Sequence, residues 1–543
     1  VDILNDRLDS EDSSSELGIH ILNIFPIMIA NCSFIIPERK LQSILCHLAM
    51  ILCSEEASSP IFESAQSCLY EFCSSLHKQV SVYSTENVKK STSKVYDSFR
   101  EKAPKTLSDN SYAVAYWSLL QDLIARLTEQ NAAWISNGGD FQAVALSPFM
   151  CAELLLKCLE SDANVLLNRI EFSSLFNYLF VNASVALLKD EKTDPELIAV
   201  TLTATQILFT RFTAMISAIP VVLDAISEKI HHWLKKKKSL NPTRCLLLQF
   251  LRGVFSDKQF FVTCLSTWSN NVTEVVKEVC ALLQACFSKC SVEELAAVMG
   301  EEKENMSVRE ESVCGNEGGF LLCLMCVEHV SEGCVESLKQ PLGQNGDVLT
   351  VLQSFVSTCL LPLSATYQEL LQTSCGEDVF RHVLLAQAAL LPLYGALDLT
   401  SDQLRNVFTV CQLALPEIPA QEAKKRSAET VFSYKNLAAI ESLSVVCVGN
   451  GEGMTGVWRL VEATLEVIEE YIPGKDNDNH YMSPSSPIVC AEYEIIDEQT
   501  ASLMKICEGY SVKGLNEVVE VLIETARRGI HSEIMNGRSR LIE

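Results

Sequence analysis

The stretch SPFMCAELLLKCL, Ser147 to Leu159, combines the features that decide the fold. Its first residue can cap a helix, and the proline that follows presets φ for the first helical position. The apolar residues behind this pair recur at helical spacing: Cys151, Leu154, Leu155, Cys158 and Leu159. The stretch therefore predicts an amphipathic helix that begins at Pro148 and in which cysteine serves as a small apolar residue.

The same pair of a capping residue and a proline recurs along the chain, as Ser59-Pro60, Asp194-Pro195 and Asn241-Pro242. Pro148, Pro195 and Pro242 are 47 residues apart each time, and the gap from Pro60 to Pro148 is 88 residues, close to two such steps. A period in the forties, with room for two or three helices, is typical of HEAT and armadillo repeats.

One such unit cannot bury its apolar face alone, so neighbouring units stack. No convincing strand pattern is found in the chain. We therefore predict an all-α protein, an α-solenoid of HEAT/armadillo-like helical repeats. The alternative is that the prolines align by chance, because no repeated side-chain consensus accompanies them.

The chain contains 22 cysteines, and FLLCLMCVEHVSEGC, Phe320 to Cys334, holds three of them with His329. Cys323 and Cys326 have the spacing of a zinc knuckle, with Cys314 and His329 as the remaining ligands. However, the run between them has no glycine or polar residue on which to turn, and its apolar residues fall on one helical stripe. The stretch is best interpreted as a core helix. Cysteines used in this way point to a reducing compartment, the cytosol or the nucleus.

The formal net charge of −26 disfavours general binding to nucleic acid, whose phosphates it repels. An acidic surface suits basic protein partners, although it also serves solubility. The most apolar run, Ile21 to Ile36, is short and is interrupted by Asn23, Pro26 and Asn31, so we predict no membrane span.

Composition divides the chain into three parts. Residues 1–299 are predicted to form N-terminal HEAT-like repeats, and residues 320–543 C-terminal armadillo-like repeats. Between them, residues 300–319, GEEKENMSVREESVCGNEGG, are charged and end in glycines, which favours a linker or loop. A last helix is predicted over Val512–Ile534.

GNGEGMTG, Gly449 to Gly456, contains a G-x-G-x-x-G match that in a dinucleotide-binding unit follows a strand. The preceding residues also fit a helix, and no βαβ alternation is found elsewhere. A connection between two helices is the favoured interpretation, and a nucleotide site is the alternative.

The only strong basic run is HHWLKKKK, His231 to Lys238. Its lysines, Lys235, Lys236, Lys237 and Lys238, form a possible nuclear-localisation signal or basic patch. Cations also complement the dipole at a helix C-terminus, and this helix has to end before Pro242. No motif of a hydrolase, a P-loop or a zinc protease is present. We predict no catalytic residue, cofactor or metal, and no enzyme activity.

The region from about Phe355 to Val448 includes DVFRHVLLAQAALLPLYGALDLTSDQLRNVFTVCQLALPEIP and, after a polar break, FSYKNLAAIESL. It resembles the C-terminal half of the apoptosis inhibitor 5 family, in which a Pro-containing loop leads to an F-S/T-Y segment that opens a helix. The matching positions are Phe432, Ser433 and Tyr434, with Leu415-Pro416 before the break.

The chain departs from that family at Lys435 and Asn436, which replace Val-Glu, and it has no basic C-terminal tail. The resemblance implies a nuclear HEAT-plus-armadillo scaffold without enzyme activity that binds partner proteins and restrains apoptosis. From the residues alone, we predict a scaffold in the nucleus and/or cytoplasm that binds basic or amphipathic protein segments. The alternative on the same architecture is a nuclear transport or trafficking adaptor.

Overall fold

The computed structural model describes most of the chain between residues 16 and 469, and beyond these only Val519 and Ile523. The described ranges are 16–31, 38–54, 59–83, 111–128, 146–167, 170–212, 217–236, 242–289, 316–339, 347–372, 376–397, 399–417, 432–447 and 455–469. Nearly all of these residues are helical, and none of them lies in a strand.

The contacts between residues divide the chain into two units, Val1–Val254 and Phe255–Glu543. The helices of the first unit are α2 (Glu16–Asn31), α3 (Glu38–Ser54), α4 (Pro60–Tyr83), α5 (Ser111–Leu127), α7 (Pro148–Leu167), α8 (Ile170–Ser174), the π-helix η2 (Leu175–Phe180), α9 (Val181–Lys189), α10 (Pro195–Phe212) and α11 (Ile219–Lys236). The boundary between the units falls near the end of α12 (Pro242–Phe255).

The helices of the second unit are α13 (Lys258–Thr267), α14 (Ser269–Phe287), α16 (Asn316–Lys339), α17 (Asp347–Phe355), the π-helix η6 (Val356–Leu360), α18 (Leu363–Gln372), α19 (Glu377–Ala396), α20 (Thr400–Ala414), α22 (Tyr434–Cys447) and α23 (Thr455–Glu469).

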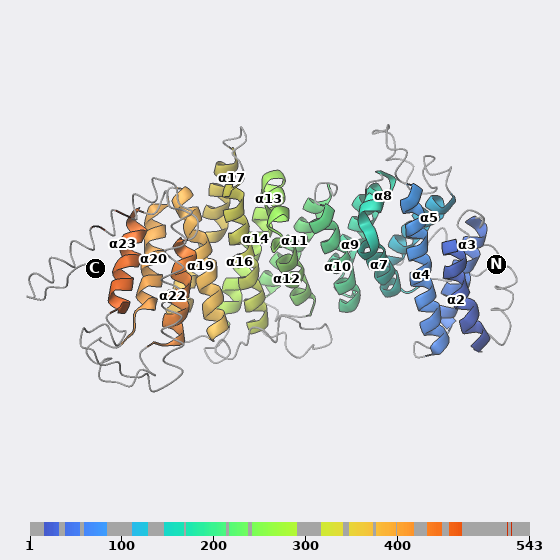
Figure 1. Cartoon of the computed structure of the whole chain (residues 1–543), viewed down its shortest axis with the longest axis horizontal. Coiled ribbons are helices and arrows are strands. Elements are labelled where there is room, and N and C mark those ends of the chain that lie inside the picture. The colour runs from blue at the N-terminus through green and yellow to red at the C-terminus, as the bar shows by residue number, and fades with distance from the viewer. Residues whose placement is uncertain are drawn as a thin grey trace, which may run out of the picture. The chain divides into compact units, whose positions relative to one another are not determined.

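Each unit is a stack of helices in two layers, and within each unit the helices lie side by side (Figure 1). In the first unit α2, α4, α7 and α10 contact one another in chain order and form a first layer. A second layer consists of α3, α5, α9 and α11. In the second unit the first layer is α13, α16, α19 and α22, whereas α14, α17, α18, α20 and α23 cover it from one side. Because each helix packs mainly on its neighbours along the chain, the fold is an all-α, HEAT/armadillo-like solenoid.

The predicted cap–proline pairs begin helices of the first unit. Pro60, Pro148 and Pro195 are the first residues of α4, α7 and α10, and Pro242 is the first residue of α12. Ser59 Oγ accepts a hydrogen bond from the Phe62 N–H at 3.2 Å. Two further caps have the same form, Ser147 Oγ with the Met150 N–H at 3.2 Å and Asp194 Oδ1 with the Glu196 N–H at 3.0 Å. Pro60, Pro148 and Pro195 thus begin successive helices of the first layer. Because α4 packs directly on α7, the 88-residue gap between Pro60 and Pro148 corresponds to one step of this layer, not to two.

The cysteine-rich stretch at Phe320 lies inside α16, as predicted, and Cys323, Cys326 and Cys334 are fully buried there. Burial raises the pKa of the Cys323 and Cys334 thiols well above the usual value. No group of ligands that could hold a metal ion occurs among the described residues, and Cys314 lies outside them. The cysteines found as free thiols are all buried, whereas Cys245 is disulfide-bonded.

One predicted boundary differs from the structure. The description of α10 reaches Phe212 and α11 begins at Ile219, and residues 213–216 between them lie outside the described ranges. Pro220 is thus the second residue of α11, a position where its missing N–H costs no hydrogen bond. The predicted linker 300–319 overlaps α16, which begins at Asn316, and Phe320 in its second turn packs against Phe287 of α14. The predicted division into HEAT-like and armadillo-like parts at this linker stays a prediction.

In the part of the chain that the structure describes, no single helix has the length and hydropathy of a membrane span. The neighbouring segments Leu349–Leu360 and Leu363–Gln372 pass that test only as a pair, and they are bent by 46° relative to each other.

Candidate functional site

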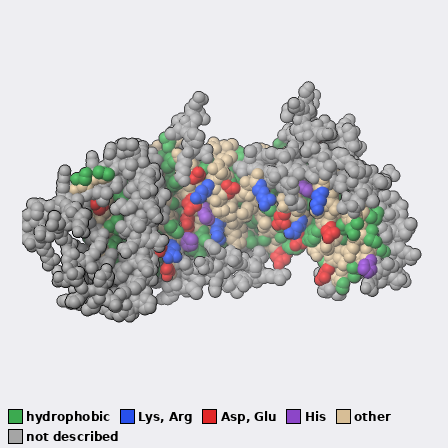
Figure 2. All heavy atoms as spheres, viewed as in Figure 1, with side chains coloured by type: hydrophobic (Ala, Val, Ile, Leu, Met, Phe, Trp, Pro, Cys, Tyr) green, Lys and Arg blue, Asp and Glu red, His purple; other side chains and the backbone are tan. Residues whose placement is uncertain are grey.

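A row of charged side chains connects the first-layer helices of the second unit, and we call it the charged ladder. It consists of Lys258 on α13, Glu328 and Glu332 on α16, Arg381 and His382 on α19, and Glu441 on α22. Figure 2 shows acidic, basic and histidine side chains interspersed on the viewed face around α16. Since the ladder crosses four helices that adjoin in space, it forms one continuous polar surface across the layer.

Ion pairs hold the side chains of the charged ladder across the helix boundaries. Lys258 Nζ lies 3.2 Å from Glu332 Oε2, and His382 Nδ1 lies 2.8 Å from Glu328 Oε2. Arg381 Nη2 lies 3.6 Å from Glu441 Oε2. These side chains are partly exposed. Their accessible fraction ranges from 13% for Glu328 to 49% for Arg381. The ladder therefore presents ordered charges to solvent instead of burying them.

Carboxylates predominate on α16, the central helix of the charged ladder. Glu328, Glu332 and Glu336 recur at intervals of four residues, so they lie along one stripe of the helix. All three are partly exposed. The nearby His329 imidazole and the Lys258 ammonium hold the pKa of Glu332 below its usual value, so that this carboxylate is ionised at neutral pH.

The end of the charged ladder is tied to the second layer by a buried amide, Asn436. Its Oδ1 accepts hydrogen bonds from the N–H and from the hydroxyl of Ser433, both at 2.7 Å. Its Nδ2 donates to the carbonyl oxygens of Leu413 at 2.8 Å and Leu415 at 2.9 Å. One side chain thus joins the start of α22 to the C-terminus of α20, and the Phe-Ser-Tyr segment opens α22 as the sequence resemblance implied.

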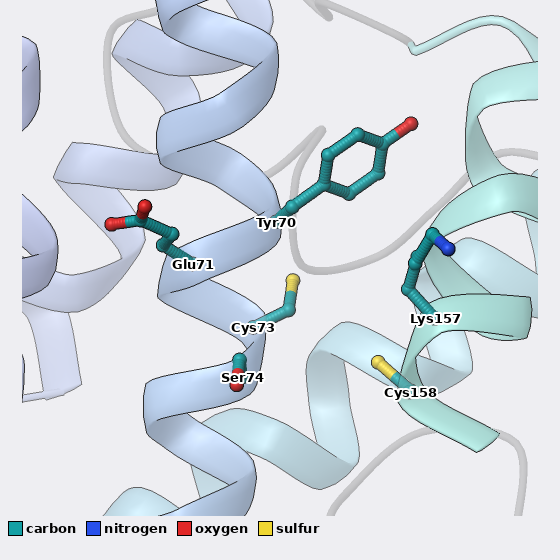
Figure 3. Close-up of a pocket in the computed structure, with 6 residues that line it drawn as sticks. All are labelled: Tyr70, Glu71, Cys73, Ser74, Lys157 and Cys158. Carbon is teal, nitrogen blue, oxygen red and sulfur yellow. The ribbon is translucent and has the colours of Figure 1, made fainter. Parts of the chain in front are cut away.

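In the first unit a cavity of about 250 Å³ lies between the first-layer helices α4 and α7. Its walls are formed by Tyr70, Glu71, Cys73, Ser74, Lys157 and Cys158. Figure 3 shows Cys73 on α4 and Cys158 on α7 pointing toward each other, with the Tyr70 ring on one side. The Tyr70 hydroxyl donates to Glu153 Oε2 at 3.0 Å and fastens α4 to α7 at this edge.

The two thiols of this cavity have different electrostatic surroundings although each is 2% exposed. A hydrogen bond from Cys73 and a second from the Tyr116 hydroxyl lower the pKa of Cys158, against the effect of burial. The same contact and burial raise the pKa of Cys73 well above its usual value. In contrast, burial raises the pKa of Cys68, one turn away on α4, to about 12. Cys158 is therefore the thiol whose ionised form the fold stabilises.

The predicted basic run is only partly within the described residues. α11 ends at Lys236, Lys235 is exposed, and Lys237 and Lys238 lie outside the described ranges. Trp233 of this run is buried, and the Arg244 guanidinium lies 4.9 Å from its ring centroid. The role of Lys235–Lys238 as a localisation signal or basic patch stays a prediction.

The glycine segment 449–456 has a helix, not a strand, before it. α22 continues to Cys447, and α23 begins at Thr455, so that Gly456 is helical. Residues 448–454 lie outside the described ranges. In a dinucleotide-binding unit the glycines follow a strand. Here the apolar run SVVC before them is the last turn of the helix α22. The nucleotide-site alternative therefore loses its support.

The charged ladder and the thiol pair were not predicted from the sequence. The ladder residues lie up to 183 positions apart (Lys258 to Glu441), and Cys73 is 85 positions from Cys158. The only signal for either was the placement of Cys73 and Cys158 on first-layer helices that start at a cap–proline pair. A cap–proline pair predicts where a helix begins, but it does not predict which side chains of neighbouring helices contact each other.

No protein-family model and no curated protein sequence matches the chain. The solved structures that are similar include a circular tandem repeat protein with novel repeat topology, at 12% identity and a TM-score of 0.30 over 96% of this chain and 100% of that one. Kap121p is similar at 10% identity and a TM-score of 0.23, over 97% of this chain and 56% of that chain.

A third similar structure is described as a conserved phosphorylation switch that controls the interaction between cadherin and beta-catenin. It has 11% identity and a TM-score of 0.21, over 99% of this chain and 97% of that one. The assignment of the fold rests on the helices and their contacts, and the resemblance to the apoptosis inhibitor 5 family stays a hypothesis.

Proposed function

We propose that this protein is a non-enzymatic helical-repeat scaffold that binds partner proteins, and that the charged ladder is its binding surface. The observation that carries the proposal is the continuity of the ladder across α13, α16, α19 and α22. Stacked repeats offer extended surfaces of this kind, on which an elongated segment of a partner contacts several helices at once.

The partner we propose is a basic or amphipathic protein segment. The α16 stripe contributes carboxylates from Glu328, Glu332 and Glu336, and the whole chain has a net charge of −26. Charge complementarity increases association rates and selects against partners of the same sign. The side chains of the ladder are already held by ion pairs, so that little conformational entropy is lost when a partner binds.

The proposal is tested by selecting binders to the full chain from a display library of random linear peptides. We expect the selected peptides to be enriched in Lys and Arg, alone or alternating with apolar residues, and their binding to weaken with added salt. A triple variant, Glu328→Gln, Glu332→Gln and Glu441→Gln, removes three ladder carboxylates. It should weaken the best peptide roughly tenfold, since each exposed charge contributes up to about 1 kcal/mol.

The matched control removes three carboxylates from other faces of the molecule. Glu228→Gln on α11, Glu274→Gln on α14 and Glu369→Gln on α18 change exposed residues and remove the same amount of negative charge. This control should bind the peptide as the native chain does, and both variants should keep the native circular dichroism spectrum. If the two variants lose binding equally, the loss is explained by the change in net charge alone. The charged ladder is then not the binding site.

A location in the nucleus and/or cytoplasm is part of the proposal and rests on the basic run Lys235–Lys238, of which Lys235 is exposed. The resemblance noted above suggests a nuclear scaffold that restrains apoptosis, and a transport or trafficking adaptor is the alternative on the same fold. A fluorescent fusion with all four lysines changed to alanine should lose nuclear signal if this run directs import. Binding to a small GTPase in its triphosphate form would favour the adaptor.

A further inference from the structure

The cavity between α4 and α7 is lined by two thiols that come from different helices and face each other (Figure 3). Each thiol shifts the pKa of the other, and neither is engaged in a disulfide. Most other thiols among the described residues serve as small apolar side chains of the core, but these two border a cavity large enough for several water molecules. A small polar oxidant can therefore reach two thiols that line the same cavity.

Donors around Cys158 prepare it for reaction. The Tyr116 hydroxyl lowers the pKa of Cys158. His77 Nδ1 lies 3.2 Å from that hydroxyl, so that its N–H can donate to the tyrosine oxygen. The imidazole and phenol rings meet edge to face, with centroids 5.8 Å apart, which fixes the orientation of Tyr116. Hydrogen-bond donors stabilise the thiolate, the form of cysteine that attacks peroxides.

We propose that Cys73 and Cys158 are an oxidisable dithiol, in which hydrogen peroxide converts Cys158 to a sulfenic acid that Cys73 then resolves as a disulfide between α4 and α7. In the first step the Cys158 thiolate attacks one peroxide oxygen, the O–O bond breaks, and hydroxide leaves and takes up a proton to form water. In the second step the Cys73 sulfur attacks the Cys158 sulfur, the S–O bond breaks, and the departing hydroxide takes the Cys73 proton and leaves as a second water. Two thiols and one peroxide thus give one disulfide and two waters.

The disulfide would connect two adjacent first-layer helices that are now joined by noncovalent contacts, including the hydrogen bond from Tyr70 to Glu153. It closes a loop of 85 residues between Cys73 and Cys158 and removes conformational freedom from the unfolded chain. Oxidation should therefore raise the unfolding temperature of the first unit. This inference is independent of the charged ladder, which lies in the second unit.

The test is peptide mapping of the full-length native chain after treatment with hydrogen peroxide, removal of the peroxide by catalase, and alkylation in denaturant. Cleavage after Lys, Arg and Glu isolates each thiol, because FCSSLHK contains only Cys73 and CLE contains only Cys158. We expect these two peptides to appear linked, with the mass of two hydrogens missing, and to separate again after dithiothreitol. Cys68→Ser is the matched control, since it removes a buried thiol of the same helix and should leave the link intact.

The order of the two steps is tested with dimedone, which labels sulfenic acids. Cys73→Ser should give a dimedone adduct on Cys158, whereas Cys158→Ser should leave Cys73 unlabelled. Tyr116→Phe should slow the formation of the disulfide in the otherwise native chain. The proposal is overturned if both thiols of the folded native chain remain fully alkylatable after peroxide, or if the linked peptides form only in chain unfolded with urea. The peptide mapping is done on the native chain and needs no variant. It therefore decides the proposal even if one of the variants fails to fold.

Discussion

Replacing Asn436 by alanine should destabilise the second unit more than any ordinary surface substitution. The side chain is 6% exposed and makes four hydrogen bonds, two to Ser433 and two to the carbonyl oxygens at the end of α20. Alanine leaves the carbonyls of Leu413 and Leu415 and the Ser433 N–H without this partner. Each buried polar group left unpaired costs about 1–3 kcal/mol, and water can reach part of this region because Ser433 is exposed.

The expected loss is therefore about 3 kcal/mol, which lowers the unfolding temperature of a unit of this size by about 6–12 °C. Thermal unfolding followed by circular dichroism at the helix band measures the shift, and amide hydrogen exchange of residues 434–447 should rise in the variant. Asn270→Ala, at an exposed position of α14, is the matched control and should change the stability by less than about 0.5 kcal/mol. If the two alanine variants unfold at the same temperature, Asn436 does not tie α22 to α20.

Three further substitutions test other contacts. Gly333→Ala should destabilise the second unit by about 1–3 kcal/mol in urea unfolding, because the added Cβ would lie 2.4 Å from Cδ1 of the Phe261 ring. Lys258→Met should cost about 0.2–1 kcal/mol at pH 7, since Lys258 helps to lower the pKa of Glu332. A lowered pKa stabilises the fold above the unfolded value near 4.5 and ceases to do so as the pH falls through the folded value, so the difference should vanish in acid. Asp194→Ala should cost about 1 kcal/mol in thermal unfolding through the loss of the α10 cap.

Each of these substitutions has a result that would contradict its explanation. Gly253→Ala is the control for Gly333, because the nearest atoms to its added Cβ belong to the end of the flexible Gln206 side chain, which can move. Equal destabilisation by the two glycine variants would count against the ring contact. A Lys258→Met defect that persists unchanged at low pH would exclude the ion pair with Glu332 as its cause. Asp194→Ser should restore most of the stability lost in the alanine variant, and failure to do so would show that capping is not the reason.

The sequence predicted the helices because their signals are local. A cap, a proline and an apolar stripe lie within about four turns of one another, and Ser147 and Asp194 cap α7 and α10 as expected. The linker boundary was predicted less well, since α16 already begins at Asn316, inside the predicted linker 300–319. The two π-helices, Leu175–Phe180 and Val356–Leu360, were not predicted from the apolar period of the sequence.

The site could not be predicted from local pattern. Glu328 and His382 are ordinary charged residues of two separate helices until α16 packs on α19 and brings them within 2.8 Å. Cys73 and Cys158 each fit the apolar stripe of a core helix, and only the packing of α4 on α7 distinguishes them from thiols such as Cys68. Asn436 was noted in the sequence as a departure from a family pattern. Its role became visible only when α20 and α22 were placed together.

Amide hydrogen exchange of the full chain, with and without the tightest-binding basic peptide, tests the binding surface most directly. The account predicts that the peptide protects the amides of α13, α16, α19 and α22 and leaves those of α14, α18, α20 and α23 unchanged. Protection confined to the second group of helices, with the first group unaffected, would contradict it.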